Sequence, residues 1–241
     1  MRYPGEVWFL PPEARAEGDF KWRRHVLLTT CRERGDIGIF AYASTSAVEP
    51  GFGGANVLVD PYASTYRHTG FSAFTYVMPC RLVPATSEDM QRMAGRLIDE
   101  MPAIRSELRR ALGIGTGTCA ASRTSASLRG CVVELRDGLA TESGVRLGVI
   151  VTEAGYSLAG RYQLLIPLLD AAEYDSQADD VLAIGTKWAR ELFPPLEQAI
   201  LAVRLVQTAF QPLEIARVLP IVVDDATIGE IDRALLRVFG L

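Results

Sequence analysis

The sequence contains the same ordered set of short segments twice, on either side of a stretch rich in Gly, Ser, Thr and Ala. The first set opens with PGEVWFL, continues through RRHVLLTT and IGIFAYAST, and closes with TYVMPCRLV and a helical segment ending in ALGIG. The second opens with RGCVVEL, continues through VRLGVIVTE and RYQLLIPLL, and closes with RVLPIVV and a segment ending in RVFGL. A repeated order of elements indicates one small fold that has been duplicated and fused.

The segment GIGTGTCAASRTSASLRG, residues 113–130, separates the two sets and is typical of a flexible connector, because it has no apolar periodicity. A chain of 241 residues is long enough for two domains of ordinary core size. We therefore predict a first domain over residues 1–117, a linker over 118–128 and a second domain over 129–241.

In the first half, short apolar runs bounded by turn residues predict a series of strands, which favours a small barrel. These runs are 6–10, 25–30, 37–43, 56–59 and 74–83. The signal TSED at 86–89 then precedes helical spacing through Met90, Met93 and Leu97. We expect a helix packed on the barrel, restarted at Pro102 and ended at Gly113.

The second half repeats this pattern with a different middle. Strands are predicted at 131–135, 146–152, 161–168 and 217–223, followed by a shorter helix from about Asp225. Between residues 170 and 211 lie an acidic loop and the run KWARELFPPLEQAILAVRLVQTAF, where Leu196, Ile200, Val203 and Val206 have helical spacing. We therefore predict a helical insertion in the second barrel.

Several kinds of site are excluded by absent motifs. The chain has no GxGxxG, GxxxxGK[ST], HExxH or GxSxG motif, and only two histidines, His25 and His68. The four cysteines show neither CxxC pairing nor nearby histidine ligands: Cys31, Cys80, Cys119 and Cys131. We expect buried thiols, no metal site and no cofactor.

Hydropathy and charge restrict the partners of the chain. No apolar run reaches the ~18 residues that span a bilayer, and the N-terminus has no signal core, so we expect a cytoplasmic protein without a membrane partner. The net charge is −4, but residues 1–128 carry 15 Lys+Arg against 13 Asp+Glu, and residues 129–241 carry 10 against 16. If either half binds a polyanion, we expect the first. The alternative is that two solvated surfaces simply differ in charge.

The strongest polar signal lies at two neighbouring strand ends of the first half. Arg23 and Arg24 directly precede the run 25–30, and the hydroxyl cluster beginning with Ser44 and Thr45 ends the next strand. A guanidinium and a hydroxyl that converge on one phosphate are a minimal set for cleavage of RNA by its own 2′-hydroxyl. The alternative is an arginine that pairs with a carboxylate at the barrel rim. Nearby Trp22 and Tyr42 are candidates for base stacking, although aromatic residues at strand ends also serve as packing.

The order of these residues resembles the MazF/PemK/Kid toxins over residues 1 to about 115. The resemblance rests on PGEVWFL, a polar loop with Glu17 and Gly18, R-H-V-L-L, a strand ending in Ser/Thr, TYVMPCRLV and RLIDEMPAIRSELRRALGIG. It implies an SH3-like barrel with a C-terminal helix, and so a mainly β fold of the α+β class. It also implies a metal-independent endoribonuclease of toxin–antitoxin modules, which acts on single-stranded RNA, works as a homodimer and has an antitoxin protein as partner.

Carried over by position, the family's arginine falls on Arg24, with Arg23 as its close rival, and the family's Ser/Thr falls on Ser44 or Thr45. His25 stands where the family usually has proline. Lys21 and Trp22 would then contribute to RNA binding beside these residues.

In the second half, TESGVRLGVIV places Glu142 and Arg146 where the family has its acidic residue and arginine. Leu147 replaces the proline, and Leu168 and Leu169 replace the Ser/Thr. A leucine cannot hydrogen-bond a phosphate, so we expect at most one complete site, in the first half.

The resulting prediction is two tandem MazF-like barrels that form an intramolecular pseudo-dimer. The first half would cleave single-stranded RNA by attack of a 2′-hydroxyl on its own phosphate, with Glu142 and Arg146 on a second rim of the RNA groove. The alternative is that catalysis is lost and the chain is a protein-binding module, either like the gyrase-poisoning toxins of the same fold or as an inert partner-binding relative. The missing prolines, Leu168, Leu169 and the overall acidity favour this alternative.

Overall fold

The chain divides into two compact units, Met1–Ala111 and Leu112–Leu241. The structure is a computed structural model, and it describes residues 1–11, 23–32, 36–45, 56–63, 68–114, 128–136, 147–153, 162–171, 181–183, 199–210 and 215–241. The predicted linker, 118–128, lies outside these residues except for Leu128.

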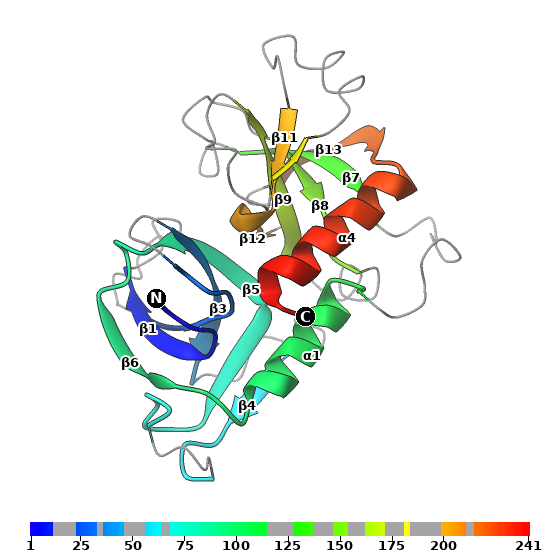
Figure 1. Ribbon diagram of the computed structural model, residues 1–241. Coiled ribbons are helices and arrows are strands. Elements are labelled where there is room, and N and C mark those ends of the chain that lie inside the picture. Colours follow the sequence, from blue (N-terminus) through cyan, green and yellow to red (C-terminus); the bar gives the residue numbers. More distant parts are fainter. Residues whose placement is uncertain are drawn as a thin grey trace. The chain divides into compact units, whose positions relative to one another are not determined.

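The first unit is built on one antiparallel sheet of six strands, in the order β4-β5-β3-β2-β1-β6. Figure 1 shows these strands curling around an interior instead of lying flat. The strands are β1 (Glu6–Leu10), β2 (Arg23–Leu27), β3 (Ile37–Ser44), β4 (Val57–Val59), β5 (Thr75–Thr86) and β6 (Arg92–Arg96). All the strands predicted for this half are present, with bounds shifted by a few residues.

The helix predicted to begin after residue 89 is wrong in its first part, where the chain forms β6 instead. The Asp89 carboxylate accepts hydrogen bonds from the backbone N–H (2.9 Å) and the hydroxyl (2.7 Å) of Thr86, which closes a turn. β6 then pairs with β1, with Met93 opposite Trp8. Apolar spacing alone does not reveal this pairing, because β1 is distant in sequence.

Helix α1 (Met101–Ala111) has Pro102 in its first turn, as predicted, where the missing N–H costs no hydrogen bond. It packs against β5 and β4, and its buried side chains include Ile104 and Leu108 (Figure 1). The apolar stripe of this segment is therefore core packing.

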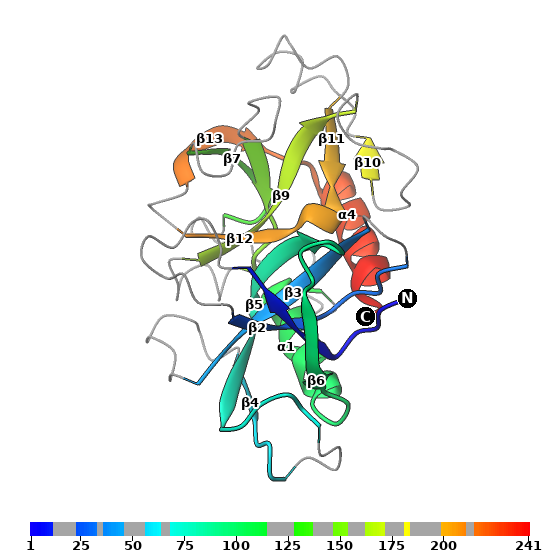
Figure 2. The same cartoon turned by 90° about the vertical axis from the view of Figure 1, so that its left-hand side faces the viewer.

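The second unit also contains an antiparallel sheet, in the order β10-β11-β9-β8-β7-β13, with β12 paired to β9 (Figure 2). The strands are β7 (Cys131–Leu135), β8 (Leu147–Ile150), β9 (Tyr162–Asp170), β10 (Val181–Ala183), β11 (Ala199–Ala202), β12 (Gln207–Phe210) and β13 (Ile215–Val222). The strands predicted near 131, 146, 161 and 217 are all present.

The helix predicted over the end of the 170–211 segment is wrong for the part that the structure describes. Residues 199–210 form β11, a 3₁₀ turn η2 (Val203–Leu205) and β12. Ile200 lies on β11, Val203 begins η2 and Val206 follows it, and all three are buried. Their helical spacing therefore reflects burial around a tight turn. The earlier part of the predicted helix lies outside the described residues.

The two sheets have the same strand order when each is counted from its own first strand. If the strands of the second unit are numbered from its own first strand, β7, the order in both sheets is fourth, fifth, third, second, first and last. In the first unit, the long strand β5 pairs with both ends of β3. In the second unit, β11 pairs with the end of β9 and β12 with its beginning, so together they occupy the place of β5.

Equivalent glycines precede the first strand of each unit. Gly5 and Gly130 directly precede β1 and β7 and have positive φ angles of 91° and 83°. The Gly5 N–H donates to the carbonyl of Leu27 at the end of β2 (2.7 Å), and the Gly130 N–H donates to the carbonyl of Ile150 at the end of β8 (2.8 Å). This left-handed conformation favours glycine because other residues carry a clashing Cβ.

A threonine buried beyond the second strand makes the same hydrogen bond in each unit. The Ile39 N–H donates to the Thr29 hydroxyl (3.1 Å), and the Leu164 N–H donates to the Thr152 hydroxyl (2.6 Å). Both threonines are 2% exposed. The hydroxyl satisfies a backbone donor that has no access to water at either position.

The apolar interiors also use equivalent positions. In the first unit, Leu10, Leu27 and Phe40 share one buried cluster. In the second unit, the positions in the same register hold a corresponding buried cluster of Leu135, Ile150 and Leu165. The two cores are therefore built from the same strands and the same sides of those strands.

The second unit ends with α4 (Asp225–Phe239), which is longer than α1 and not shorter as predicted. The Asp224 side chain caps its first turn by accepting from the Thr227 N–H (2.7 Å). Gly240 ends it in a left-handed conformation. Neither helix in the described part of the chain has the length and apolar character needed to cross a bilayer.

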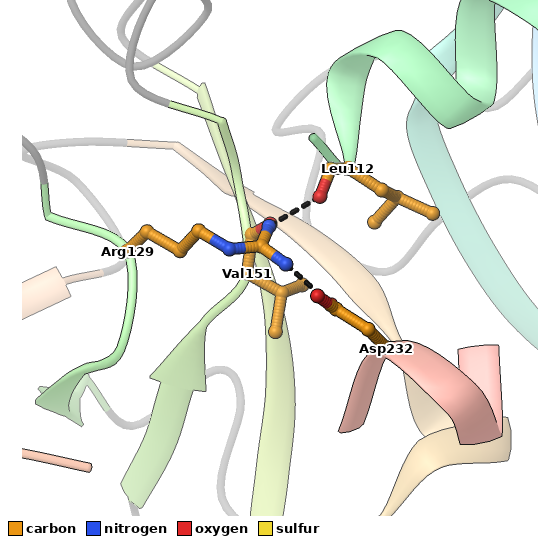
Figure 3. A network of polar contacts seen from close by, with 4 residues as sticks. All are labelled: Leu112, Arg129, Val151 and Asp232. Atoms are coloured by element: carbon orange, nitrogen blue, oxygen red, sulfur yellow. Dashed lines mark hydrogen bonds and ion pairs between the residues drawn. The ribbon is translucent and has the colours of Figure 1, made fainter. Parts of the chain in front are cut away.

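A largely buried arginine links three parts of the second unit (Figure 3). The Arg129 guanidinium donates to the carbonyls of Leu112 and Val151 and forms an ion pair with Asp232 on α4. Burial raises the pKa of the Asp232 carboxyl above its usual value, against the lowering effect of Arg129. This network attaches the start of the unit and the end of β8 to the terminal helix.

Candidate functional site

Arg24 lies in the middle of the first sheet, on β2. It is paired in register with Phe9 of β1, and its guanidinium carbon lies 5.2 Å from the centroid of the Phe9 ring. The residue is half-buried, and its Nε is buried and has no hydrogen-bond partner among the described residues. A cation held over an aromatic ring with an unused donor is suited to binding an anionic group.

Ser44 belongs to the opposite face of this sheet. His25 of β2 is paired with Tyr42 of β3, and their rings are in edge contact with centroids 5.5 Å apart. Successive residues of a strand alternate between faces, so Ser44 shares the face of Tyr42 and His25. Arg24, next to His25, is on the other face.

The sheet therefore does not bring Arg24 and Ser44 together on one face. Continuing the β2–β3 register beyond His25 and Tyr42 puts the position of Arg23 beside Ser44, and the position of Arg24 beside Ala43. Thr45 follows the end of β3 and is exposed. Of the two neighbouring arginines, Arg23 is therefore the one whose backbone position lies opposite Ser44 in the extended register and on the same face of the sheet.

Register also relates these positions to the second unit. Counting from the equivalent pairs, Arg24 corresponds to Leu147 and Ser44 to Leu169. Position 146, directly before β8, corresponds to Arg23. At this place the second unit has apolar packing in the core, because Leu169, Ile200 and Ala202 form a buried cluster.

Arg81 of β5 is a further basic residue at this site, and its local sequence did not single it out. Its guanidinium carbon lies 4.1 Å from the centroid of the Tyr42 ring, on the face of Ser44. The register between β3 and β5 shifts here, since Ala41 pairs with Leu82 and Tyr42 with Met78. The intervening residues 79–81 form a bulge, and a proline at 79 inside a predicted strand was a signal for it.

The bulge also carries Cys80, which is 8% exposed. Burial raises the pKa of its thiol to about 12. A thiol with this pKa is protonated at neutral pH, so Cys80 is not suited to act as a nucleophile.

The remaining predicted site residues are not part of the described structure. Lys21, Trp22, Glu142 and Arg146 all lie outside the described residues, and so does Cys119. Among the described residues, no group of three His, Cys, Asp or Glu side chains is arranged to hold a metal ion.

No model of a known protein family matches the chain, and no curated protein sequence matches it. Among solved structures, the toxin MazF-mt6 of Mycobacterium tuberculosis matches with a TM-score of 0.34 and 18% sequence identity. The match covers 46% of this chain and 98% of that toxin. At this TM-score the similarity does not define a fold or a function for the chain.

Proposed function

We propose that the chain is a toxin-like, metal-independent endoribonuclease that cleaves single-stranded RNA at the rim of its first unit. The reacting set is Ser44 with an arginine of β2, and Arg23 takes precedence over Arg24. The observation that carries this assignment is the β2–β3 register, which groups the position of Arg23 with Ser44 and puts Arg24 on the other face.

The second unit gives independent support for Arg23. The residue pattern around Arg146 resembles the segment in which the family has its arginine. Position 146 corresponds in register to Arg23. Arg24 corresponds instead to Leu147. One arginine position is therefore common to both halves of the chain, whereas the hydroxyl is retained only at Ser44.

The reaction forms a bond between the ribose 2′-oxygen and the adjacent phosphorus while the bond from phosphorus to the 5′-oxygen breaks. The 2′-hydroxyl loses a proton and the departing 5′-oxygen gains one, which leaves a 2′,3′-cyclic phosphate and a 5′-hydroxyl. Arg23 balances the extra negative charge of the pentacoordinate phosphorus, and the Ser44 hydroxyl donates to a non-bridging oxygen. Arg81 over Tyr42 adds positive charge on the same face.

The two units then represent one barrel duplicated within a single chain. The shared strand order, the equivalent glycines and the equivalent threonine hydrogen bonds support this duplication. Leu169 in its buried cluster is the reason to assign the reacting groups to the first unit alone. An antitoxin protein is the expected regulatory partner.

The test is to incubate the purified chain with mixed-sequence single-stranded RNA in EDTA and to identify the product ends by mass spectrometry. We expect 2′,3′-cyclic phosphate ends and no cleavage where the 2′-hydroxyl is replaced by hydrogen. Arg23→Ala should lower kcat by about 10²- to 10³-fold, as for loss of one preorganised donor. Ser44→Ala should also lower kcat, and Ser44→Thr should retain activity.

Arg92→Ala is the matched control, because Arg92 is an exposed arginine on the edge strand β6 of the same unit. Intact RNA after incubation with several substrates would reject the enzyme and leave the protein-binding module as the alternative. A larger loss of kcat in Arg24→Ala than in Arg23→Ala would keep the activity and reverse the assignment of the arginine.

A further inference from the structure

We propose that the open face of β4 and β5 in the first unit is a base-stacking platform for single-stranded RNA, formed by Leu58, Tyr62, Phe74 and Tyr76. This inference rests on the proposed function and deepens it, because the platform adjoins Ser44. It assigns a binding role to residues that the reaction itself does not use.

The two faces of β4 and β5 differ sharply in exposure. Val59 and Val77 are 0% exposed and Thr75 is 2% exposed, on the face that α1 packs against. On the other face, Leu58 is 50% exposed and Phe74, just before β5, is 52% exposed. Alternation along the strands therefore leaves an apolar and aromatic surface open to solvent.

Local hydrogen bonds hold the aromatic residues in place. The Tyr62 N–H donates to the Asp60 carboxylate (2.8 Å), and the Tyr62 hydroxyl donates to the carbonyl of Ser72 (3.3 Å). The rings of Tyr62 and Phe74 are in edge contact, with centroids 6.4 Å apart and an interplanar angle of 68°. Tyr62 is 79% exposed. Two exposed rings that are already in contact with each other can stack on bases at a lower ordering cost than free side chains.

The platform is continuous with the proposed reacting group. Tyr76 is the register partner of Ser44 on one side and of Leu58 on the other. Adjacent strands are about 4.8 Å apart, so Ser44 is within about 10 Å of Leu58 along this row. A nucleotide stacked on the platform is therefore a near neighbour of a phosphate held at Ser44.

The second unit supports a link between the platform and Ser44. The positions of Ser44 and Tyr76 are taken there by Leu169 and Ile200, which are 4% and 2% exposed in one apolar cluster. At these two described positions, the hydroxyl and the tyrosine are thus both replaced by buried apolar side chains. This joint replacement is expected if Ser44 and Tyr76 serve the same RNA strand.

The experiment measures the Kd of the full chain for a fluorescent 2′-O-methyl RNA oligonucleotide of mixed sequence, which cannot be cleaved by 2′-hydroxyl attack. Phe74→Leu and Tyr62→Leu keep apolar area but remove the ring. Each should raise the Kd by about 5- to 150-fold, as for loss of one base stack. Phe74→Tyr keeps the ring and should bind like the unchanged protein. Tyr62→Phe keeps the ring but loses the hydrogen bond to Ser72, so its Kd should lie between those of the unchanged protein and Tyr62→Leu. Met93→Ala is the control, because Met93 is an exposed apolar residue on β6.

In cleavage assays, the two leucine variants should raise KM and leave kcat within about twofold, because stacking holds the strand but not the reacting atoms. RNA cleavage with an unchanged Kd in both leucine variants would overturn the platform and leave the endoribonuclease standing. Ring-dependent binding without cleavage of ordinary RNA would support the platform and reject the enzyme. Failure of the unchanged chain to bind the oligonucleotide would overturn the platform and favour a protein-docking surface.

Discussion

The equivalent threonines Thr29 and Thr152 provide a stringent test of the correspondence between the two units. Replacing either by valine keeps the shape of the side chain and removes the hydroxyl that accepts from Ile39 or Leu164. The backbone N–H is then left buried without its partner, which costs about 1–3 kcal/mol. Both threonines are 2% exposed, so water does not replace the hydroxyl. We expect a similar loss, of about 2 kcal/mol, from each substitution.

The assay is amide hydrogen exchange followed residue by residue, since global unfolding of a chain with two units need not be a single transition. A loss of about 2 kcal/mol corresponds to roughly 30-fold faster exchange through local opening. In Thr29→Val the faster amides should include Ile39, and in Thr152→Val they should include Leu164. In each variant, the amides of the unit that does not carry the substitution should exchange at their original rates.

Thr29→Ser and Thr152→Ser are the matched controls, because serine keeps the accepting hydroxyl and loses only a methyl group. The amides of Ile39 and Leu164 should remain protected in these variants. Unchanged exchange in both valine variants would show that the hydroxyls are not the acceptors. A difference above about 2 kcal/mol between the two valine variants would refute the equivalence of the positions.

Three further predictions concern groups that take no part in the proposed reaction. Arg129→Met should lower the free energy of opening of the second unit by about 3–5 kcal/mol in amide hydrogen exchange, because it leaves the largely buried Asp232 carboxylate unpaired. The double variant with Asp232→Leu should recover most of this loss. The pKa of Asp232 is raised in the folded state, so the stability of the unchanged chain relative to Asp232→Asn should fall as pH rises above about 4. A rise in relative stability would contradict the direction of the shift. Burial raises the pKa of Cys80 to about 12, so iodoacetamide at pH 9 should alkylate it in the folded chain roughly a thousand times more slowly than in the chain unfolded by urea. The rates are measured by mass spectrometry, and equal rates would refute the burial of Cys80.

Much of the strand content was predictable from local sequence. Short apolar runs bounded by turn residues predicted β1 and β7 with the bounds that the structure has, and α4 begins at Asp225 as predicted. The two segments misread as helix share one cause. Met90, Met93 and Leu97, like Ile200, Val203 and Val206, have a spacing that suits a helix as well as a bent or bulged strand. The pairing of β6 with β1, and of β11 with β9, decides between them.

The proposed site shows where local sequence stops being sufficient. The sequence by itself determined which residue types are available: two adjacent arginines before one strand, hydroxyls after the next, and leucines at the corresponding place in the second half. Only the tertiary structure decided which arginine is grouped with Ser44, and which aromatic residues stay open to solvent. The physical reason is the two-residue period of a strand, because a shift of one residue moves a side chain to the other face. Arg23 and Arg24 are neighbours in sequence, but register with β3 assigns their positions to opposite faces of the sheet.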